Sequence, residues 1–491
     1  MTHPNDIPLG TLVMKFGGTS VGTPQAMAQT VEIVRQSRSK WPRLVVITSA
    51  LATVTNSLLE SATRSAQGET QVIIQNATRL KQLHYQIVDT LVIIPEHRTQ
   101  VLEEIDQRIA EFASLCRAMS ILGEATPRAL DTVGALGERL SVRVLAAALR
   151  EAGVDAQAVE STCLIETDDC FQNAHPDFIA STRKTYQELD PLLAAGCVPV
   201  VTGFIGATAT GITTTLGRGG SDYSAGILGS ILPAHDVWIW TDVDGVMSAD
   251  PRLVPEARTI PEITYREIAE LAYFGAKVLH PKTIRPLVDA GIGLRICNTF
   301  NPSHPGTRLV PDKPADPNKK PNGKEIIKAV TAIRDQRLIT VEGRGMLGVP
   351  GVAARTFAAV ASTGTSVPLI TQASSEQSIC FAVPSSTCQE VIVALESTFA
   401  PEITRKDIDH IWATQGISII TVVGAGMIHT PGVAGQIFGA LGVAEVNVIA
   451  IAQGSSEVSI SLVVKEDDTE AAVKTVHSLI LTNGMNSKEI Q

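Results

Sequence analysis

A lysine close to two adjacent glycines is the first pattern in this chain that could do chemistry. In KFGGTS, only Phe16 separates Lys15 from Gly17 and Gly18. Because glycine has no Cβ, a phosphate oxygen can approach these backbone N–H groups, with the Lys15 ammonium beside them. The order differs from the phosphate-binding loop G-x-x-x-x-G-K-[ST], in which the lysine follows the glycines. The stretch predicts an anion site at the end of a strand, with the Lys15 ammonium held next to the bound anion.

A second glycine-rich stretch, LGRGGSDYSAG (Leu216–Gly226), repeats this logic in front of a helix. Ser221 is expected to cap that helix, which places Asp222 and unpaired backbone N–H groups at a helix start, where anions bind. Arg218 adds a planar guanidinium that can grip a carboxylate through two hydrogen bonds. The stretch therefore predicts a second anion-binding loop.

Three further stretches add carboxylates and a second lysine. TDVDGVMSADPR (Thr241–Arg252) follows a buried strand and offers Asp242 and Asp244 to a nucleoside. FGAKVLHP supplies Lys277, and in ALGERLS Glu138 lies at a helix start, where it could hold an ammonium group.

Each stretch has a structural explanation on its own, because a Gly-Gly pair usually makes a turn and a lone charge is usually solvated. Four loops that combine glycine with a charge, at the carboxyl ends of successive strands, are harder to explain in that way. Together they describe a site with two lysines, an arginine and carboxylates, which favours ATP-dependent phosphoryl transfer. The chain has neither H-R-D nor D-F-G, so it is not a protein kinase.

The elements that must position these groups follow from alternating strand-like and helix-like patterns over the first 300 residues. A helix is expected from Thr23, which can cap it, with Pro24 in the first turn. Residues from about 54 to 152 are expected to be mostly helical. Buried strands are expected at Leu12–Met14, Leu44–Ala50, Cys197–Gly206 and Asp236–Asp242. Apolar strands alternating with helices indicate an α/β fold with a largely parallel sheet covered on both faces.

The bulk composition limits the classes of protein that fit. A chain of 491 residues is expected to form two to four domains. The formal net charge of -10 argues against a nucleic-acid binder that relies on phosphate contacts. No apolar run is long enough to span a membrane, and the first ten residues lack a signal pattern. Seven scattered cysteines without C-x-x-C indicate reduced thiols and a cytoplasmic protein.

The last third of the chain contains an internal repeat. A proline- and lysine-rich stretch, Pro311–Glu325, predicts a domain boundary. Beyond it, 338–383 and 419–464 align without gaps at an offset of 81, with 21 of 46 positions identical. Each copy reads strand, turn, helix, strand, strand, helix, the size of a small ferredoxin-like α+β unit. Two copies predict a pseudo-symmetric pair.

One motif in the first repeat is misleading. Residues 343–348 match the dinucleotide fingerprint G-x-G-x-x-G after a strand and before a helix. The second repeat has Gly424 and Gly426, but His429 takes the place of the third glycine, and no acidic residue follows about 20 positions downstream at a strand end. These glycines are expected to shape a turn instead.

Taken in order, the motifs resemble those of aspartate kinases over essentially the whole chain. They are KFGGTSV, the stretch from Ser49-Ala50 to Thr55-Asn56, GE in GALGERLS, TDD with a following Phe (Thr167–Phe171), GFIG, TTLGRGGSDYSA, TDVDGV…DPR and FGAKVLHP. The resemblance implies a three-layer αβα amino-acid-kinase domain with a mainly parallel sheet, followed by two ferredoxin-like ACT domains. The expected boundaries are 10–310 for the kinase domain, 311–325 for a linker, 326–415 for the first ACT domain and 416–491 for the second. The opening strand of the first ACT domain could pair with the second.

The resemblance also implies the reaction: ATP and L-aspartate give ADP and 4-phospho-L-aspartate. The implied catalytic residues are Lys15, Asp222 and Lys277; the lysines neutralise the transferring phosphoryl group and the leaving phosphate, and Asp222 orders them. The implied aspartate-binding residues are Ser49, Thr55, Glu138, Arg218 and Ser221. The implied ATP-binding residues are Lys15, Gly17, Gly18, Ser20, Thr241, Asp242, Arg252 and Lys277. Mg²⁺ would be held mainly by ATP, with no separate metal site in the protein.

Three positions depart from the pattern of the family. Gln172 stands where glycine usually follows the Phe of the TDD stretch, and Thr53 stands where glycine is common in the substrate loop. Met247 replaces an aromatic residue that is frequent near the adenine. These departures concern loop geometry and nucleotide affinity rather than the reaction.

The repeated tail resembles the amino-acid-sensing ACT pair of threonine-sensitive aspartokinase–homoserine dehydrogenases, and the dehydrogenase half is expected to be absent. Gln372 and Gln453 occupy equivalent places in ITQASSE and IAQGSSE, and with Asn447 they are the expected effector residues. Threonine is the first expectation for the inhibitor and lysine the second. The ACT pair should also form a homodimer or a higher homo-oligomer.

Two alternatives to aspartate kinase stay open. The chain could be a catalytically silent, amino-acid-sensing regulatory subunit, which would need a broken site, yet all the charged positions named above are present. It could also be an amino-acid kinase with another acceptor, although Glu138, Arg218 and the ACT pair favour aspartate.

Overall fold

The computed structural model describes residues 10–275, 279, 281–312, 326–346, 349–372, 377–454 and 457–482. The chain divides into two compact units, and each is described by itself. The first comprises 1–246, 261–263 and 279–311, and the second comprises 247–260, 264–278 and 312–491. The sequence-based domain boundaries stay a prediction. Among the described residues, no helix is both long enough and apolar enough to cross a membrane.

The first unit is built on an eight-stranded sheet in the order β3-β5-β2-β1-β8-β10-β11-β9. These strands are β1 (Thr11–Phe16), β2 (Arg43–Thr48), β3 (Ala156–Val159), β5 (Val198–Thr202), β8 (Asp236–Thr241), β9 (Glu262–Thr264), β10 (Gly293–Asn298) and β11 (Thr307–Val310). The pairs from β3 to β10 are parallel, and β11 is antiparallel to β10. A second small sheet contains β4 (Glu166–Thr167), β6 (Ile205–Thr208) and β7 (Thr213–Thr215).

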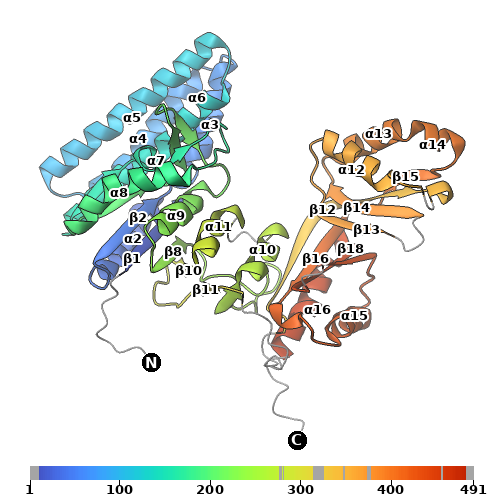
Figure 1. Ribbon diagram of the computed structural model, residues 1–491. Helices are drawn as coiled ribbons and strands as arrows, with labels where there is room; N and C mark the ends of the chain where they lie inside the picture. Colours follow the sequence, from blue (N-terminus) through green and yellow to red (C-terminus); the bar gives the residue numbers. More distant parts are fainter. Residues whose placement is uncertain are drawn as a thin grey trace, which may run out of the picture. The chain divides into compact units, whose positions relative to one another are not determined.

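Helices cover both faces of this sheet (Figure 1). They are α1 (Gly18–Val21), α2 (Pro24–Arg38), α3 (Val54–Ala66), α4 (Gln71–Leu91), α5 (Pro95–Leu122), α6 (Pro127–Gly134), α7 (Leu136–Glu151), the short 3₁₀ helix η1 (Ser161–Cys163), α8 (Phe178–Ala194), α9 (Gly220–Ile231) and α11 (Pro281–Ala290). Leu12 and Met14 of β1 face the core shared with α2, α4, α5 and α7. Because side chains alternate along a strand, Val13 and Lys15 point to the opposite face, where α9 packs.

The second unit contains the two repeats, which share one sheet in the order β13-β14-β12-β16-β18-β17, with β15 beside β12. Its elements are α10 (Tyr265–Tyr273), β12 (Ala329–Glu342), η2 (Arg344–Met346), α12 (Val352–Ser362), β13 (Leu369–Gln372), β14 (Ser378–Pro384), α13 (Cys388–Thr398), α14 (Ala400–Arg405), β15 (His410–Ala413), β16 (Ile417–Val423), η3 (Ala425–Met427), α15 (Val433–Val443), β17 (Ala450–Gln453), β18 (Ser459–Lys465), η4 (Glu466–Asp468) and α16 (Thr469–Thr482). The first half of β12 pairs with β16 of the second repeat, and its second half pairs with β14 and β15.

The repeats explain the glycine motif that resembles a dinucleotide fingerprint. A Cβ on Gly343 would lie 2.3 Å from the backbone oxygen of Asp407, and one on Gly424 would lie 2.2 Å from that of Ile326. Equivalent glycines therefore allow neighbouring backbone to pack against the strand–helix turn in both copies. The glycines shape a turn, as expected; Leu347 and Gly348 lie outside the described residues.

The sequence-based fold class is confirmed: a mainly parallel α/β unit and two α+β repeats that share an antiparallel sheet. The helix predicted at Thr23 begins at Pro24, and the Thr23 side chain caps it by accepting a hydrogen bond from the Ala26 amide. The prediction that Ser221 caps the next anion-binding helix is wrong. Helix α9 begins at Gly220 after Gly219, whose φ of 67° lies in the left-handed region that glycine adopts without strain.

Candidate active site

A buried ion pair joins the two glycine-rich stretches. Lys15 lies near the end of β1, and Asp222 lies in the first turn of α9, which packs on that strand. The Lys15 Nζ is 2.6 Å from Asp222 Oδ1, and the two side chains are only 10% and 17% exposed. The strand and the helix fix the two charges, so the ammonium group is positioned before any substrate arrives.

Gly18 forms the floor next to this pair. A Cβ there would lie 2.8 Å from the backbone oxygen of Ala50, so only glycine allows the turn after β1 to approach the turn after β2. The Ala52 amide donates to the Gly18 oxygen at 3.1 Å, and the Ser49 amide donates to the Phe16 oxygen at 3.1 Å. The two turns are therefore locked to one another at the carboxyl ends of adjacent parallel strands.

Glu138 enters the same region from the first turn of α7 and is 3% exposed. Burial raises the pKa of its carboxyl group to about 8, although hydrogen bonds from the backbone of Ala50 and of Glu138 itself and the charge of Lys15 act in the opposite direction. Its Oε2 is buried and has no hydrogen-bond partner among the described residues. A buried acceptor without a partner is costly, so this oxygen is suited to a donor supplied by a ligand.

Arg218 supplies the opposite charge. It lies in the loop between β7 and α9, is exposed, and makes no hydrogen bond or ion pair with the part of the chain that the structure describes. Its guanidinium is therefore available for a carboxylate.

One cavity of about 520 Å³ brings these groups together within the first unit. It is lined by eight of the residues that the sequence predicts for the site: Lys15, Gly18, Ser49, Thr55, Glu138, Arg218, Ser221 and Asp222. All the predicted aspartate-binding residues are in that set. A cavity with one free guanidinium, one unpaired carboxyl oxygen and a fixed ammonium fits a small zwitterion that carries a second carboxylate.

The two loop departures noted in the sequence have a common backbone property. Thr53 has a φ of 71° and Gln172 a φ of 69°, and both line the cavity. Phe204, also a lining residue, has a φ of 69°. Side chains with a Cβ are strained in this left-handed region by roughly 1–2 kcal/mol. Glycine is therefore the unstrained choice at the first two positions, and this chain keeps the loop geometry without it.

Asp131 is a site residue that the sequence analysis missed. It lines the cavity, is 2% exposed, and accepts hydrogen bonds from the Gln172 amide and from both the amide and the hydroxyl of Thr215. Burial raises the pKa of its carboxyl group, and these three donors act in the opposite direction. Asp131 thus ties the loop that carries Gln172 to β7. A lone carboxylate inside the mostly apolar run ALDTVGAL was the available signal.

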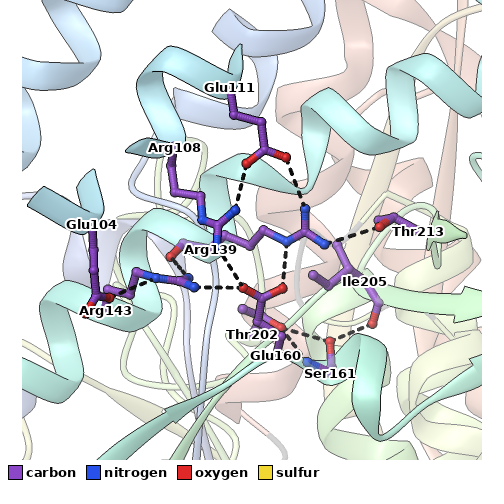
Figure 2. Close-up of polar contacts among 10 residues, drawn as sticks. All are labelled: Glu104, Arg108, Glu111, Arg139, Arg143, Glu160, Ser161, Thr202, Ile205 and Thr213. Atoms are coloured by element: carbon purple, nitrogen blue, oxygen red, sulfur yellow. Dashed lines mark hydrogen bonds and ion pairs between the residues drawn. The ribbon is translucent and has the colours of Figure 1, made fainter. Parts of the chain in front are cut away.

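A cluster of three arginines and three glutamates connects α7 to α5 and to Glu160 through ion pairs (Figure 2). Glu160 is the centre of the cluster. The Glu160 carboxylate lies 2.9 Å from Arg139 Nε and 2.8 Å from Arg143 Nη2, and both arginines are on α7. Burial raises the pKa of Glu160, but the charges of Arg139 and Arg143 outweigh it and hold the pKa below its usual range. The other members of the cluster are Arg108, Glu104 and Glu111 on α5.

The cluster continues into the segment that carries Phe204. Ser161, next to Glu160, exchanges hydrogen bonds with the Thr202 hydroxyl and donates to the Ile205 oxygen. The helix that carries Glu138 and the strands that flank the cavity are therefore fixed by one continuous polar network (Figure 2).

Of the predicted nucleotide residues, only Lys15 and Gly18 line this cavity among the described residues. The Gly17 amide donates to the Trp240 oxygen, and the fully buried Ser20 hydroxyl donates to the same oxygen and accepts from Thr299. Thr241 donates to Asp242 after β8, outside the cavity lining. Arg252 belongs to the second unit, where it is exposed and pairs with Asp250, and Lys277 lies outside the described residues.

The predicted effector residues occupy equivalent strand ends in the two repeats. Gln372 ends β13 and pairs in register with Ile379, and Gln453 ends β17 and pairs in register with Ile460. Both glutamines are exposed, as is Asn447 before β17. Gln372 lines a cavity of about 410 Å³ together with Met346, Val349, Pro350, Gly351, Val352, Ala353 and Ile379.

Comparison with known proteins assigns the chain to a family. Residues 10–298 match the amino acid kinase family, and residues 339–399 and 420–479 match the ACT domain. Aspartokinase 1 of Arabidopsis thaliana is 33% identical over 483 residues, which cover 96% of this chain and 81% of that protein. The chain belongs to the aspartokinase family.

Other aspartokinases match at similar levels. The chain is 36% identical over 476 residues to a bifunctional aspartokinase/homoserine dehydrogenase of Zea mays, with 96% of this chain covered. It spans about half, 51%, of the length of that relative. The crystal structure of Escherichia coli aspartokinase III in complex with aspartate and ADP matches with a TM-score of 0.77 and 30% identity, over 96% of this chain and 100% of that one. The same enzyme in complex with lysine and aspartate gives a TM-score of 0.76.

Proposed function

We propose that this chain is an aspartate kinase that transfers the γ-phosphoryl group of ATP to the side-chain carboxylate of L-aspartate, which gives 4-phospho-L-aspartate and ADP. This reaction begins the biosynthesis of lysine, threonine and methionine. One observation carries the proposal: a single cavity holds the Lys15–Asp222 pair, the unpaired oxygen of Glu138 and the free guanidinium of Arg218. The likeness to E. coli aspartokinase III bound to aspartate and ADP supports it.

In the proposed complex, the three charges divide the work of recognition. Arg218 binds the α-carboxylate of aspartate through two hydrogen bonds, and Glu138 accepts from its ammonium group. Ser49, Thr55 and Ser221 line the remaining wall. The side-chain carboxylate is then left facing Lys15, so the substrate is oriented by its α-substituents and reacts at its far end.

A carboxylate is already a nucleophile, so the transfer needs no general base. Catalysis then consists of positioning and of neutralising the charge on the transferring group. Lys15 supplies that charge, and Asp222 holds its ammonium in place from the start of α9. The proposed contacts for ATP remain Lys277, Gly17, Gly18, Ser20, Thr241, Asp242 and Arg252, with Lys15 shared between the two substrates. For Gly17 and Ser20 this requires that their bonds to the Trp240 oxygen break when ATP binds.

Mg²⁺ fits this arrangement as a companion of ATP. The carboxylate of Asp222 is engaged by Lys15, and that of Glu138 sits in surroundings that favour its neutral form. In the proposed complex these two carboxyl groups therefore serve Lys15 and the substrate ammonium, and Mg²⁺ takes its oxygen ligands mainly from ATP. When bound with ATP, the ion would shield the negative charge of the phosphates.

We also propose that the ACT repeats bind an inhibitory amino acid near Gln372, Gln453 and Asn447, with threonine before lysine. The cavity beside Gln372 supports a small-molecule site, and the complex of E. coli aspartokinase III with lysine shows that a relative binds lysine. Ile370 and Ile451, on β13 and β17, are 49% and 46% exposed, which supports a homo-oligomer formed through the repeats. A cytoplasmic location remains part of the proposal.

The test is ATP- and Mg²⁺-dependent formation of aspartyl hydroxamate from L-aspartate and hydroxylamine, run alone, with threonine and with lysine. We expect hydroxamate from the protein alone and less of it with one of the two amino acids. Folded protein that forms ADP only with another acceptor would assign it to a different amino-acid kinase. Folded protein that forms no ADP with any amino acid would favour the silent regulatory subunit.

A further inference from the structure

The loop of residues 168–175 carries three metal-ligating side chains that the proposed reaction does not use. It connects β4 to α8, and Asp168, Cys170 and His175 are all exposed. One ligand atom from each, a carboxylate oxygen, the thiol sulfur and a ring nitrogen, lies within 4.8 Å of the other two. A carboxylate, a thiol and an imidazole therefore lie close enough together to be considered as ligands of one cation.

Hydrogen bonds fix the Asp168 carboxylate and the backbone of the loop. Asp168 Oδ1 accepts hydrogen bonds from the amides of Cys170 at 3.2 Å and His175 at 2.9 Å, and the Asp168 amide donates to the His175 oxygen at 3.0 Å. The Ala174 amide donates to Thr215, which anchors the loop to β7. These bonds explain Asp168 as a structural residue, but they do not involve the thiol of Cys170, which makes no hydrogen bond in the described part of the chain.

The spacing of the ligand atoms fits a small, borderline-soft cation. In a tetrahedral site with bonds of about 2.0–2.3 Å, ligand atoms lie roughly 3.3–3.8 Å apart. His175 Nδ1 and Asp168 Oδ2 are already 3.1 Å apart. Because all three side chains are exposed, rotation about their own bonds can close the remaining gap without moving the backbone. Exposure also leaves room for water as a fourth ligand.

We propose that this loop binds one Zn²⁺ ion through Asp168, Cys170 and His175. Thiolate and imidazole ligands select Zn²⁺ over Mg²⁺, which prefers oxygen, so the site is distinct from the metal that accompanies ATP. The loop also carries Gln172, which lines the cavity of the first unit and donates to Asp131. A bound ion would therefore brace one wall of that cavity. Binding itself does not depend on the proposed activity.

The experiment uses the full chain without an affinity tag, treated with a chelator and dialysed into metal-free buffer with a reductant that does not bind metals. Co²⁺ is titrated first as a spectroscopic probe, and Zn²⁺ is then followed by calorimetry and by displacement of Co²⁺. We expect one ion per chain, a Zn²⁺ dissociation constant of about 10 µM or tighter, and a thiolate-to-cobalt absorption band in the near ultraviolet. An excess of Mg²⁺ should not remove the band.

Two variants and a matched control decide the assignment. Cys170→Ser should lose the band and at least tenfold in Zn²⁺ affinity, and His175→Ala should lose affinity to a similar extent. Cys163→Ser removes another exposed cysteine, outside the cluster, and should retain both signals. All three metal-free variants should unfold at the wild-type temperature, because the altered side chains are exposed. Equal Zn²⁺ affinity in wild type and Cys170→Ser, or no binding below about 1 mM, would overturn the proposal.

Discussion

The cavity of the first unit and the strand ends of the repeats expose polar groups to ligands in different ways. The cavity is built on buried charges: Lys15 and Asp222 are mostly shielded, and Glu138 is almost fully buried. The repeats present exposed, uncharged amides, Gln372 and Gln453, at the ends of short strands. Burying charges costs folding free energy, but it makes their interaction with a charged ligand strong. Exposed amides cost little folding free energy and form only weak hydrogen bonds with a ligand.

This difference matches the two tasks that we propose for the chain. Moving a phosphoryl group requires charges that are fixed in advance and poorly screened, which the interior of an α/β sheet provides. Sensing an amino acid requires reversible binding within a range of concentration, for which neutral hydrogen bonds at a surface are sufficient. The same contrast recurs inside the first unit. The Glu160 cluster pairs all its charges (Figure 2), whereas the cavity leaves a carboxyl oxygen of Glu138 without a partner among the described residues.

The largest effect is expected for Lys15→Ala, which removes the fixed cation. We predict at least a 10²-fold loss in kcat for hydroxamate formation, by analogy with the loss of one preorganised donor. Lys81→Ala is the matched control, because Lys81 forms an exposed ion pair with Asp106 on the same unit. Near-normal turnover in Lys15→Ala, with folding intact, would refute the catalytic role of the cavity.

The second prediction concerns the pH dependence that burial gives to Glu138. Its pKa of about 8 means that the group is largely neutral below that pH in the free protein. An ammonium ligand requires the carboxylate, so the KM for aspartate should fall as pH rises from about 6.5 to 8.5 and level off above the pKa. Glu138→Gln should raise KM about tenfold or more and abolish this pH dependence.

The same shift has a consequence for stability with the opposite sign. A carboxyl group whose folded-state pKa is raised holds its proton in the folded protein over a range where the unfolded chain releases it. It therefore lowers the free energy of unfolding progressively between its unfolded pKa near 4.5 and about pH 8. Denaturant unfolding of wild type and Glu138→Gln should diverge across this range. A constant difference between them, or a KM with the same pH slope in both, would contradict the role of burial.

Exposed amides should give a smaller, purely regulatory effect. Gln453→Ala should weaken inhibition by the effector several-fold, about the value of one neutral hydrogen bond, and leave uninhibited turnover intact. Gln372→Ala should do the same in the first repeat. Gln436→Ala, an exposed glutamine on α15 away from the strand end, is the control. Inhibition curves that superimpose for all three variants would remove the glutamines from the effector site.

A substitution in the Glu160 cluster tests whether its charges serve stability rather than catalysis. Glu160→Gln should destabilise the protein by about 1–3 kcal/mol, because Arg139 and Arg143 lose the charge that neutralises them. The KM for aspartate should rise a few-fold through α7, while kcat stays within about threefold of wild type. Glu32→Gln, which breaks an exposed pair with Arg35, should leave unfolding unchanged. A loss of kcat as large as that of Lys15→Ala would show that the Glu160 cluster takes part in catalysis together with the cavity.

The smallest effect tests the strained backbone of the cavity loops. Gln172→Gly should relieve the left-handed conformation and raise the free energy of unfolding by about 0.5–1 kcal/mol, after the entropic cost of glycine. Gln67→Gly makes the same substitution at an exposed position with a φ of -84°, and it should destabilise instead. Shifts of equal sign in denaturant unfolding would show that Gln172 carries no strain.

The sequence by itself determined the fold class and the charged residues that line the cavity, because local patterns specify both. Apolar strands alternating with helices predict a parallel sheet, and Lys15, Gly18, Glu138 and Arg218 stand in short motifs whose residue types already describe an anion site. The repeat likewise placed Gln372 and Gln453 at equivalent strand ends, since an ungapped duplication preserves the register.

Only the tertiary structure decided which polar groups face a ligand and which are consumed by folding. Gly17 and Ser20 sit in the strongest motif, yet Trp240 from a neighbouring strand takes their hydrogen bonds. Asp131 has no motif, and it becomes part of the site because β7 and the Gln172 loop converge on it. The raised pKa of Glu138 also comes from burial by elements distant in sequence. Hydrogen-bond partners and desolvation depend on contacts between remote segments, which a local pattern does not contain.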